Sequence, residues 1–335
     1  MKPERLLSLI ERFDEVKVLA LVDLVADEYV YGQISRVSRE APVLILKHDR
    51  TELVPGGGAN AVNNIAALGG HALAVGLVGK DKAGGELLAR LRRARVDVTA
   101  VAREPAYTTP TKTRVLAGGA QSAKQQVLRI DRGAPLSTND ALERRLSSAI
   151  AELLPRASAV LVSDYGYGLI SPRLARAVAT RSASLRKVST LDSRFSILSH
   201  RGFTAATPNL PEVEAALGVE VGGDSMKLEK AGRQMLRRLK ARAVLVTRGS
   251  SGMSLFEVGR PTAHIPVFGT DEVADVTGAG DTVIGTFTLA LGAGASFVEA
   301  ATLANYAGGI VVMKRGTATL SREELAAAVE RGTDR

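Results

Sequence analysis

The feature that most constrains the fold is a repeated alternation between short apolar runs and helical patterns. The apolar runs are nearly continuous, rich in β-branched residues and bounded by Gly, Asp or Pro, as expected for parallel strands buried on both faces. Such alternation predicts a doubly wound α/β fold, with a mainly parallel sheet flanked by helices. The predicted strands are Val18–Val22, Ala72–Val78, Ala159–Ser163, Val188–Leu191, Phe203–Ala206 and Ala243–Thr247, and the predicted helices are Ala59–Leu68, Gly84–Ala94, Asp140–Leu154, Pro172–Arg181 and Met226–Leu239.

Two places break this alternation, because two strand-like segments follow each other there without a helix between them. Tyr29–Ile34 is followed by Val43–Arg50, and Thr111–Leu116 is followed by Gln125–Ile130. Four such strands predict a small separate β-sheet beside the main one. We therefore expect a single domain over residues 1–335, with lid strands inserted at about 29–50 and 111–130.

Composition and charge exclude several classes of protein. The 335 residues include no cysteine, which excludes disulfides and cysteine–zinc sites and fits a cytoplasmic location. The net charge is +9, but the basic residues are spread over predicted helix faces, and with 4% aromatic residues we expect no nucleic-acid partner. No apolar run is long enough for a membrane span, and the first residues lack the apolar core of a signal peptide.

The strongest motif is Asp275–Asp281, DVTGAGD, which leads directly into an apolar helix. Glycines at a helix start leave backbone N–H groups open to an anion, and the positive end of the helix dipole adds to the attraction. A carboxylate beside such a site can accept a proton from a hydroxyl during phosphoryl transfer. We predict Asp281 as catalytic base, next to an anion hole formed by Thr277, Gly278, Ala279 and Gly280. The structural alternative is a glycine turn followed by an ordinary acidic helix start.

A second motif is the glycine-rich segment Pro55–Asn60, followed by a predicted helix. Asn60 and Asn64 lie on one face of that helix, and amide side chains suit sugar hydroxyls because they donate and accept. The spacing from Gly56 to Ala61 imitates a dinucleotide fingerprint, but that fingerprint follows a buried apolar strand and the preceding residues here are polar.

Two weaker motifs follow predicted strands, at the edge where open α/β sheets bind ligands. Asn209 and Glu212 have oxygen ligands of the kind that hold Mg²⁺ through water, although in isolation a helix cap is the favoured explanation of the pair. Thr247 and Gly249 lie in a strand-to-turn segment and give weak evidence for nucleotide binding. The chain has no P-loop and no protein-kinase motif set, so an ATP enzyme of this sequence needs another phosphate cradle.

These segments, in this order, resemble the ribokinase/PfkB family of carbohydrate kinases from about Val18 to about Thr319. The family's D-x-T-G-A-G-D signature matches Asp275–Asp281, and its di-glycine and N-x-x-E segments are also present. Within the family, the likeness is greatest to the D-glycero-β-D-manno-heptose-7-phosphate kinases, through Val22–Val43 and Leu303–Thr317. Bifunctional members of that group carry a further H-x-G-H motif, which this sequence lacks, so we expect only the kinase step.

The resemblance implies a ribokinase-like fold, ATP and Mg²⁺ as cofactors and a homodimer formed through the lid, and it leaves a need for a monovalent cation open. It also assigns roles by position. Asp27, Gly56, Gly57 and Asn60 would line the sugar pocket; Arg36, Lys112 and Arg129 would hold a sugar phosphate; Asn209 and Glu212 would serve Mg²⁺; Thr247, Gly249, Asn209 and Asn305 would lie along the nucleotide.

Three functions remain open at this point. The first is phosphorylation of the anomeric hydroxyl of D-glycero-D-manno-heptose 7-phosphate to the 1,7-bisphosphate. The second is a related kinase for another sugar, sugar phosphate or nucleoside, because Tyr167 stands where the heptose group has a lysine and the lid segment Ala117–Lys124 is longer than usual. The third is a non-catalytic sugar sensor, which the intact Asp275–Asp281 segment argues against.

Overall fold

The computed structural model describes residues 2–119, 124–136, 140–269 and 274–332. Within these residues, nine strands form the main sheet: β1 (Lys17–Val22), β4 (His71–Gly79), β5 (Asp97–Glu104), β8 (Ala159–Asp164), β9 (Val188–Ser193), β10 (Ala205–Ala206), β11 (Ala243–Thr247), β12 (Met253–Glu257) and β13 (Ala263–Ile265). Their order is β13-β12-β11-β10-β9-β8-β1-β4-β5. All pairs are parallel except those of β12 with β11 and β13, so the predicted mainly parallel α/β sheet is confirmed.

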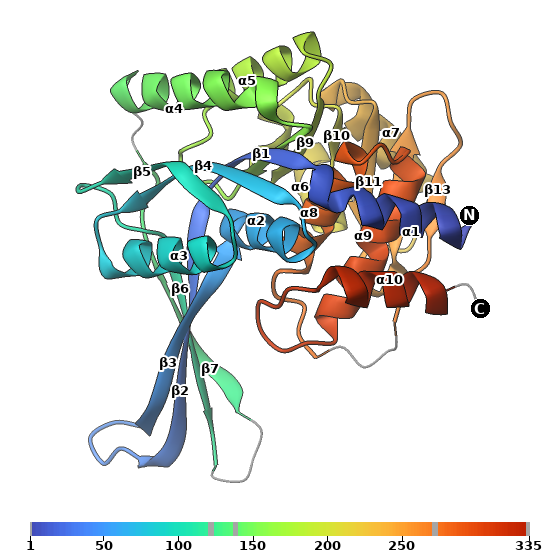
Figure 1. The fold of residues 1–335 in the computed structure, drawn as a ribbon. Coiled ribbons are helices and arrows are strands. Elements are labelled where there is room, and N and C mark those ends of the chain that lie inside the picture. Colours follow the sequence, from blue (N-terminus) through green and yellow to red (C-terminus); the bar gives the residue numbers. More distant parts are fainter. Residues whose placement is uncertain (1, 120–123, 137–139, 270–273, 333–335) are drawn as a thin grey trace.

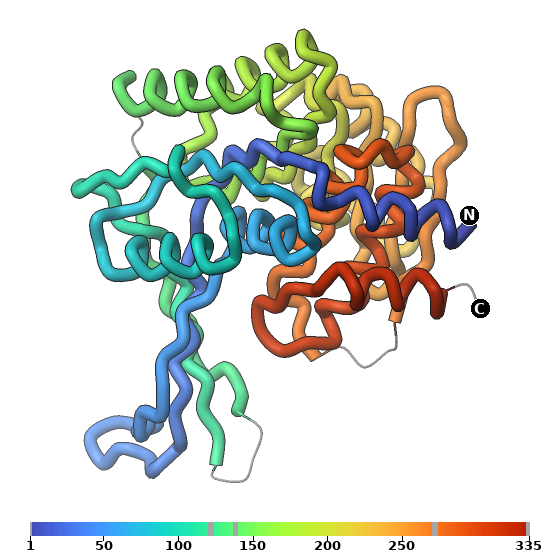
Figure 2. The backbone as a smooth tube through the Cα atoms, in the orientation of Figure 1, coloured from blue at the N-terminus to red at the C-terminus, as the bar shows by residue number. Residues whose placement is uncertain are grey.

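A second sheet of four strands projects from the body of the molecule (Figures 1 and 2). It consists of β2 (Leu24–Val37), β3 (Leu44–Gly57), β6 (Thr111–Gly118) and β7 (Gln125–Arg132), in the order β3-β2-β6-β7. We call this sheet the lid. The two hairpins β2–β3 and β6–β7 are antiparallel, and β2 runs parallel to β6. Residues 120–123, within the predicted lid insertion, lie outside the described residues.

The lid strands are longer than the sequence predicts, and they reach into the body. β2 begins at Leu24, only two residues after β1 ends, and β3 ends at Gly57, where α2 (Gly58–Ala67) begins. The predicted sugar-pocket residues Asp27, Gly56 and Gly57 therefore lie at the base of the lid, where it joins the main sheet.

Helices cover both faces of the main sheet (Figure 1). The remaining ones are α1 (Pro3–Glu11), α3 (Lys82–Arg93), α4 (Asp140–Leu153), α5 (Pro172–Ser184), α6 (Leu210–Leu217), α7 (Ser225–Leu239), α8 (Ala279–Gly292), α9 (Phe297–Val312) and α10 (Arg322–Arg331). On β1, Val18, Ala20 and Val22 pack into the core formed with α2, α8 and α9, whereas Leu19 and Leu21 pack into the core formed with α4, α5 and α7. Because successive strand residues face opposite sides, a strand covered on both faces is apolar throughout.

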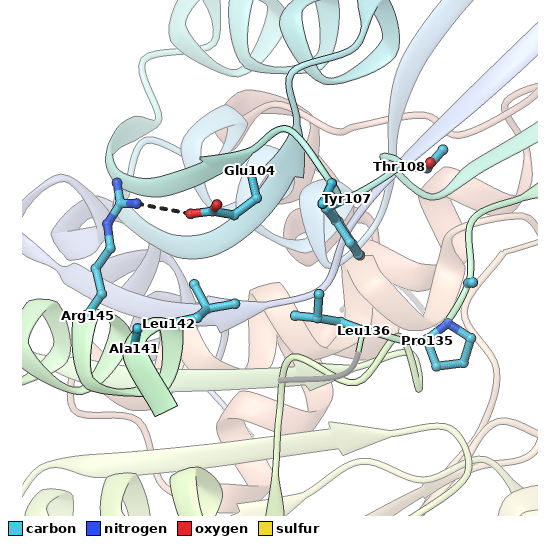
Figure 3. A pocket seen from close by; sticks show the side chains of 10 residues that line it. Glu104, Tyr107, Thr108, Pro135, Leu136, Ala141, Leu142 and Arg145 are labelled. Carbon is cyan, nitrogen blue, oxygen red and sulfur yellow. Dashed lines mark hydrogen bonds and ion pairs between the residues drawn. The ribbon is translucent and has the colours of Figure 1, made fainter. Parts of the chain in front are cut away.

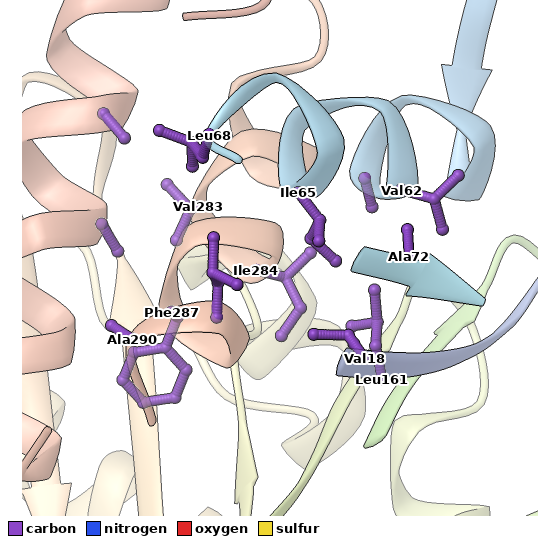
Figure 4. Close-up of a cluster of buried hydrophobic side chains, with 14 of the residues drawn as sticks. Val18, Val62, Ile65, Leu68, Ala72, Leu161, Val283, Ile284, Phe287 and Ala290 are labelled. Atoms are coloured by element: carbon purple, nitrogen blue, oxygen red, sulfur yellow. The ribbon is translucent and has the colours of Figure 1, made fainter. Parts of the chain in front are cut away.

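Helix α8, which carries the predicted base at its start, lies in the first of these cores. Val283, Ile284 and Phe287 of α8 belong to one buried cluster with Ile65 of α2 and Val18 on the sheet (Figure 4). Phe287 is fully buried, so its replacement by alanine is expected to cost about 3–5 kcal/mol. This packing fixes the N-terminus of α8 relative to the ends of the strands.

Candidate active site

The site lies where the parallel strands of the main sheet end, which is the usual ligand-binding edge of an open α/β sheet. Asp23 follows β1, Asp164 ends β8 and Asp192 lies near the end of β9. Asp281, in the first turn of α8, belongs to the same region, since its charge acts on Asp192.

The start of α8 has the geometry of an anion hole. Gly278 is the N-cap of the helix, with φ at +80°, a conformation that other residues rarely adopt. A Cβ on Gly278 would lie 2.6 Å from Asn60 Nδ2, so this turn also requires glycine for lack of space. At Gly280 a Cβ would meet nothing within 4 Å, so the space beside this residue in the first turn of α8 is open.

Asp281 is held by two side chains that reach it from other elements. Tyr165 Oη donates to its Oδ1 at 2.6 Å, and Asn60 Nδ2 donates to its Oδ2 at 3.2 Å. Asn60 also contacts the carbonyl oxygen of Gly278 at 3.2 Å, and its own Oδ1 accepts from Asn64 Nδ2 at 3.1 Å. The Asn60 side chain, predicted to face a sugar, is therefore engaged in orienting the base.

The environment of Asp281 shifts the pKa of its carboxyl toward neutral pH. Burial raises its pKa to about 7, against the hydrogen bonds from Tyr165 and Asn60, which lower it. Burial and the nearby charge of Asp281 raise the pKa of Tyr165 well above its ordinary value, so the phenol keeps its proton and acts as the donor. A base with a pKa near the working pH is the most effective one for general-base catalysis.

A cavity of about 380 Å³, which we call the acceptor chamber, opens beside Asp281. Many of the predicted residues line it: Asp27, Gly57, Lys112, Arg129, Thr277, Gly278 and Asp281. Burial lowers the pKa of Lys112, and the charge of Asp27 acts against this. Four further residues belong to this site, although no role was predicted for them from the sequence. Arg114 forms an ion pair of 2.8 Å with Asp27, and Thr317 donates to Asp27 at 3.0 Å. Tyr165 and Arg194 line the chamber.

Two of the three predicted sugar-phosphate cations are poorly placed for that role. Arg36 lies nine residues beyond Asp27 on the same lid strand, which puts it roughly 30 Å along the lid, and it does not line the chamber. Arg129 lines the chamber, but its guanidinium makes two contacts with Asp131, at 2.9 and 3.0 Å. Lys112 lines the chamber together with Asp281, the predicted base, and their charges act on each other.

The predicted metal residues also form a helix cap. Asn209 is the N-cap of α6, with Asn209 Oδ1 accepting from Glu212 N at 2.8 Å and Glu212 Oε2 accepting from Asn209 N at 2.9 Å. Burial raises the pKa of Glu212, and burial followed by the charge of Glu212 raises the pKa of Asp192 well above its ordinary value. Asp192 and Glu212 are both half-buried, and two carboxylates that repel each other suit a divalent cation. In the described part of the chain, three or more His, Cys, Asp or Glu side chains are nowhere grouped for direct metal binding.

The predicted nucleotide residues come from three elements near the same edge. Thr247 ends β11 and forms a bridge with Asn209. Gly249 follows with φ at +55°. Asn305 is in α9, where its Nδ2 donates to the carbonyl oxygen of Pro266 at 2.9 Å.

Another cavity, of about 570 Å³, lies between the end of β5 and the start of α4 (Figure 3). Apolar side chains such as Tyr107, Leu136 and Leu142 form much of its wall, and Arg145 contacts Glu104 at 3.4 Å across it. None of the predicted site residues lines it, so a large cavity alone does not mark the active site here. None of the helices in the described residues is long and apolar enough to cross a membrane.

Comparison with solved structures defines the fold class. The chain is similar to phosphofructokinase-2 from Escherichia coli in complex with potassium, with a TM-score of 0.77 and 20% identity over 95% of this chain and 99% of that one. It is also similar to Arabidopsis thaliana ribokinase complexed with ribose and ATP, with a TM-score of 0.72 and 21% identity over 94% of this chain and 99% of that one. The fold is therefore ribokinase-like, as the sequence predicts.

Sequence comparison then gives the family. The profile of the pfkB family of carbohydrate kinases matches residues 20–324, so the chain belongs to that family and is an ATP-dependent carbohydrate kinase. It is 39% identical over 96% of its length to the bifunctional protein HldE of Trichlorobacter lovleyi, and 40% identical over 94% of its length to HldE of Chromohalobacter salexigens. It spans 64% of the length of each of these relatives.

Proposed function

We propose that this chain is a single kinase domain that transfers the γ-phosphoryl group of ATP to the anomeric hydroxyl of D-glycero-D-manno-heptose 7-phosphate, giving the 1,7-bisphosphate. The observation that carries the proposal is the position of Asp281, a buried carboxylate at the N-terminus of α8 that also lines the acceptor chamber. The choice of sugar is supported by the resemblance to the heptose-phosphate kinases and by the HldE relatives.

In this proposal the acceptor lies in the chamber at the base of the lid. Asp27, Gly56 and Gly57 contact sugar hydroxyls, and the anomeric hydroxyl points to Asp281. Asp281 takes the proton of that hydroxyl. At the same time the hydroxyl oxygen forms a bond to the γ-phosphorus, and the bond between this phosphorus and the departing ADP breaks. The backbone amides of the glycines at the start of α8, Gly278 and Gly280, stabilise the charge on the transferring group.

The nucleotide lies along Thr247, Gly249 and Asn305 in the proposal. Asn209 and Glu212 hold Mg²⁺ through water, with the half-buried Asp192 close to Glu212. When bound, the cation neutralises charge on the nucleotide phosphates. Lys112, which lines the chamber together with Asp281, offsets negative charge on the transferring phosphoryl group.

The lid completes the proposed site and joins two copies of the chain. Several large apolar side chains are exposed on the lid, at 39% to 57% of their surface: Ile34, Val37, Leu44, Leu128 and Ile130. Exposed apolar patches of this kind are typical of protein interfaces, and an uncovered sheet edge favours pairing. We therefore propose that two copies of the chain form a homodimer through the lid. We also propose that the enzyme is cytoplasmic and that its small-molecule partners are ATP and the sugar.

A second candidate is a pfkB-family kinase for a neutral sugar or a nucleoside. The placement of Arg36 outside the chamber and the pairing of Arg129 with Asp131 favour it, because both reduce the positive charge available to an acceptor phosphate. The two candidates share the fold, the nucleotide site and Asp281.

An acceptor panel tests the proposal. ADP release from MgATP is measured with heptose 7-phosphate, fructose 6-phosphate, ribose, fructose and adenosine, with and without K⁺. Turnover chiefly on heptose 7-phosphate is the expected result. Preference for ribose, fructose or adenosine would replace the proposal with the second candidate, and ADP release that no acceptor stimulates would contradict both.

A further inference from the structure

A larger cavity, of about 900 Å³, adjoins the acceptor chamber between the lid and the body. We call it the distal chamber. Arg114 and Thr277 line both cavities, so the two are neighbours. The lid contributes Tyr31 and Arg50 to the distal chamber, and the segment after α9 contributes Arg315 and Thr317.

Two guanidinium groups of the distal chamber are available to a ligand. In the described residues, Arg50 and Arg315 have no carboxylate within ion-pair distance. Arg50 lies over the ring of Tyr31, 3.9 Å from its centre, and such stacking orients a guanidinium while leaving its N–H groups free. The chamber has two carboxylates, Glu52 and Asp275, and Asp275 already accepts from the backbone of Thr277 and Gly316.

Asp27 stands at the junction of the two chambers. Its Oδ2 accepts from Thr317 Oγ1 at 3.0 Å, and Thr317 Oγ1 lies 3.0 Å from Tyr29 Oη, in the wall of the distal chamber. Its Oδ1 pairs with Arg114 at 2.8 Å. A sugar that contacts Asp27 with its hydroxyls and Asp281 with its anomeric oxygen therefore has the distal chamber open to its far end.

We infer that the distal chamber binds the phosphate monoester at the far end of the acceptor, with Arg50 and Arg315 as its principal donors and Arg114 at the entrance. This inference rests on the proposed function and names the part of the site that selects a phosphorylated acceptor. A phosphate dianion requires several charged donors, and guanidinium groups meet it with paired N–H groups. In this role Arg50 and Arg315 replace the predicted pair. Arg36 lies far along the lid strand, and Arg129 is paired with Asp131.

The kinetic test compares heptose 7-phosphate with the same heptose lacking the phosphate, using Arg50→Ala, Arg315→Ala and the double variant. Both side chains are exposed, so the variants are expected to fold. The ratio of kcat/KM for the phosphorylated over the unphosphorylated heptose is expected to fall about 10- to 100-fold in the double variant. Arg132→Ala is the matched control, because Arg132 is a lid arginine next to Glu28 and lines neither chamber. An unchanged ratio would overturn the inference.

A binding experiment separates failure of the inference from failure of the proposed function. Inorganic phosphate is titrated calorimetrically into the wild type, the double variant and Arg132→Ala. Loss of one binding event in the double variant alone is expected, whichever sugar the enzyme turns over. If the double variant binds phosphate as the wild type does, the distal chamber is not a phosphate site, even where heptose 7-phosphate is the substrate.

Discussion

Tyr165 Oη donates a hydrogen bond of 2.6 Å to Asp281 Oδ1, so the proposed base is held by a phenol from the loop after β8. Tyr165 N in turn donates to Asp23 Oδ2 at 2.8 Å. The carboxylate after β1 thus fixes the loop that positions the base, and three elements distant in sequence are joined by two hydrogen bonds.

Replacing Tyr165 by phenylalanine should move the pH dependence of the reaction. Burial raises the pKa of Asp281 to about 7 and the phenol lowers it, so loss of the phenol raises it further. Because the base must be unprotonated, the acid limb of the kcat profile is expected to shift to higher pH by about one unit, with a roughly tenfold loss at pH 6.5 and recovery at alkaline pH. Tyr167→Phe, in the same chamber, is the control. An unshifted profile would remove Tyr165 from this role.

Two glycines of the anion hole should respond differently to alanine. Gly278→Ala combines a positive φ with a Cβ 2.6 Å from Asn60 Nδ2, so it is expected to lower both Tm and activity. Gly280→Ala meets no neighbouring atom within 4 Å and lies in α8, so Tm should hold or rise. Its methyl group nevertheless enters the space above the helix N-terminus, and kcat/KM for ATP should fall roughly tenfold or more. Full activity of Gly280→Ala would contradict the position assigned to the phosphoryl group.

Asp23 should destabilise the protein as the pH rises. Burial, followed by the charge of Asp164, raises its pKa to about 7 from 3.8. The folded state therefore holds this proton more tightly, and its contribution to stability is complete below pH 3.8 and is lost as the pH rises through 7. Asp23→Asn should increase the free energy of unfolding in urea by about 4 kcal/mol at pH 8, and by less than half of that at pH 5.

Asp164 supplies the matched control for that measurement. Its Oδ2 lies within hydrogen-bond distance of Ser193, Ser196 and His200, at 2.8, 2.7 and 3.1 Å. Burial acts to raise its pKa, but these hydrogen bonds outweigh it and the pKa is lowered. Asp164→Asn should therefore cost stability at both pH 5 and pH 8. A higher free energy of unfolding for Asp164→Asn, or an unchanged one for Asp23→Asn at pH 8, would contradict the opposite pKa shifts of these two carboxyls.

Much of the main sheet could be predicted from the sequence because its central strands are apolar on both faces. β10 was predicted from Phe203 but forms only at Ala205–Ala206, since Thr204 N is bound by the Ser189 side chain and not by a strand. The edge strand β5 alternates between buried and exposed residues and has no continuous apolar run, so it was not predicted.

The site could be predicted only in part. Local motifs lead to Asp281 and Gly278 because their chemistry depends on consecutive residues. The pairing of Asp27 with Arg114 depends on the register between β2 and β6, which no local pattern reveals. Tyr165 had a usable signal, since it directly follows a predicted buried strand at the ligand-binding edge of the sheet. The distance of Arg36 from Asp281 could not be predicted, because the sequence shows a cation on the lid but not where the lid places it.

The most direct test of the account is the turnover of Asp281→Asn with MgATP and heptose 7-phosphate, measured beside ATP binding. Asparagine keeps the size of the side chain and can still accept from Tyr165, but it cannot take a proton from the acceptor. The account predicts a kcat lowered by roughly 100- to 10,000-fold with ATP affinity kept within a few-fold. Near-normal turnover in Asp281→Asn would contradict the assignment of Asp281 as the catalytic base.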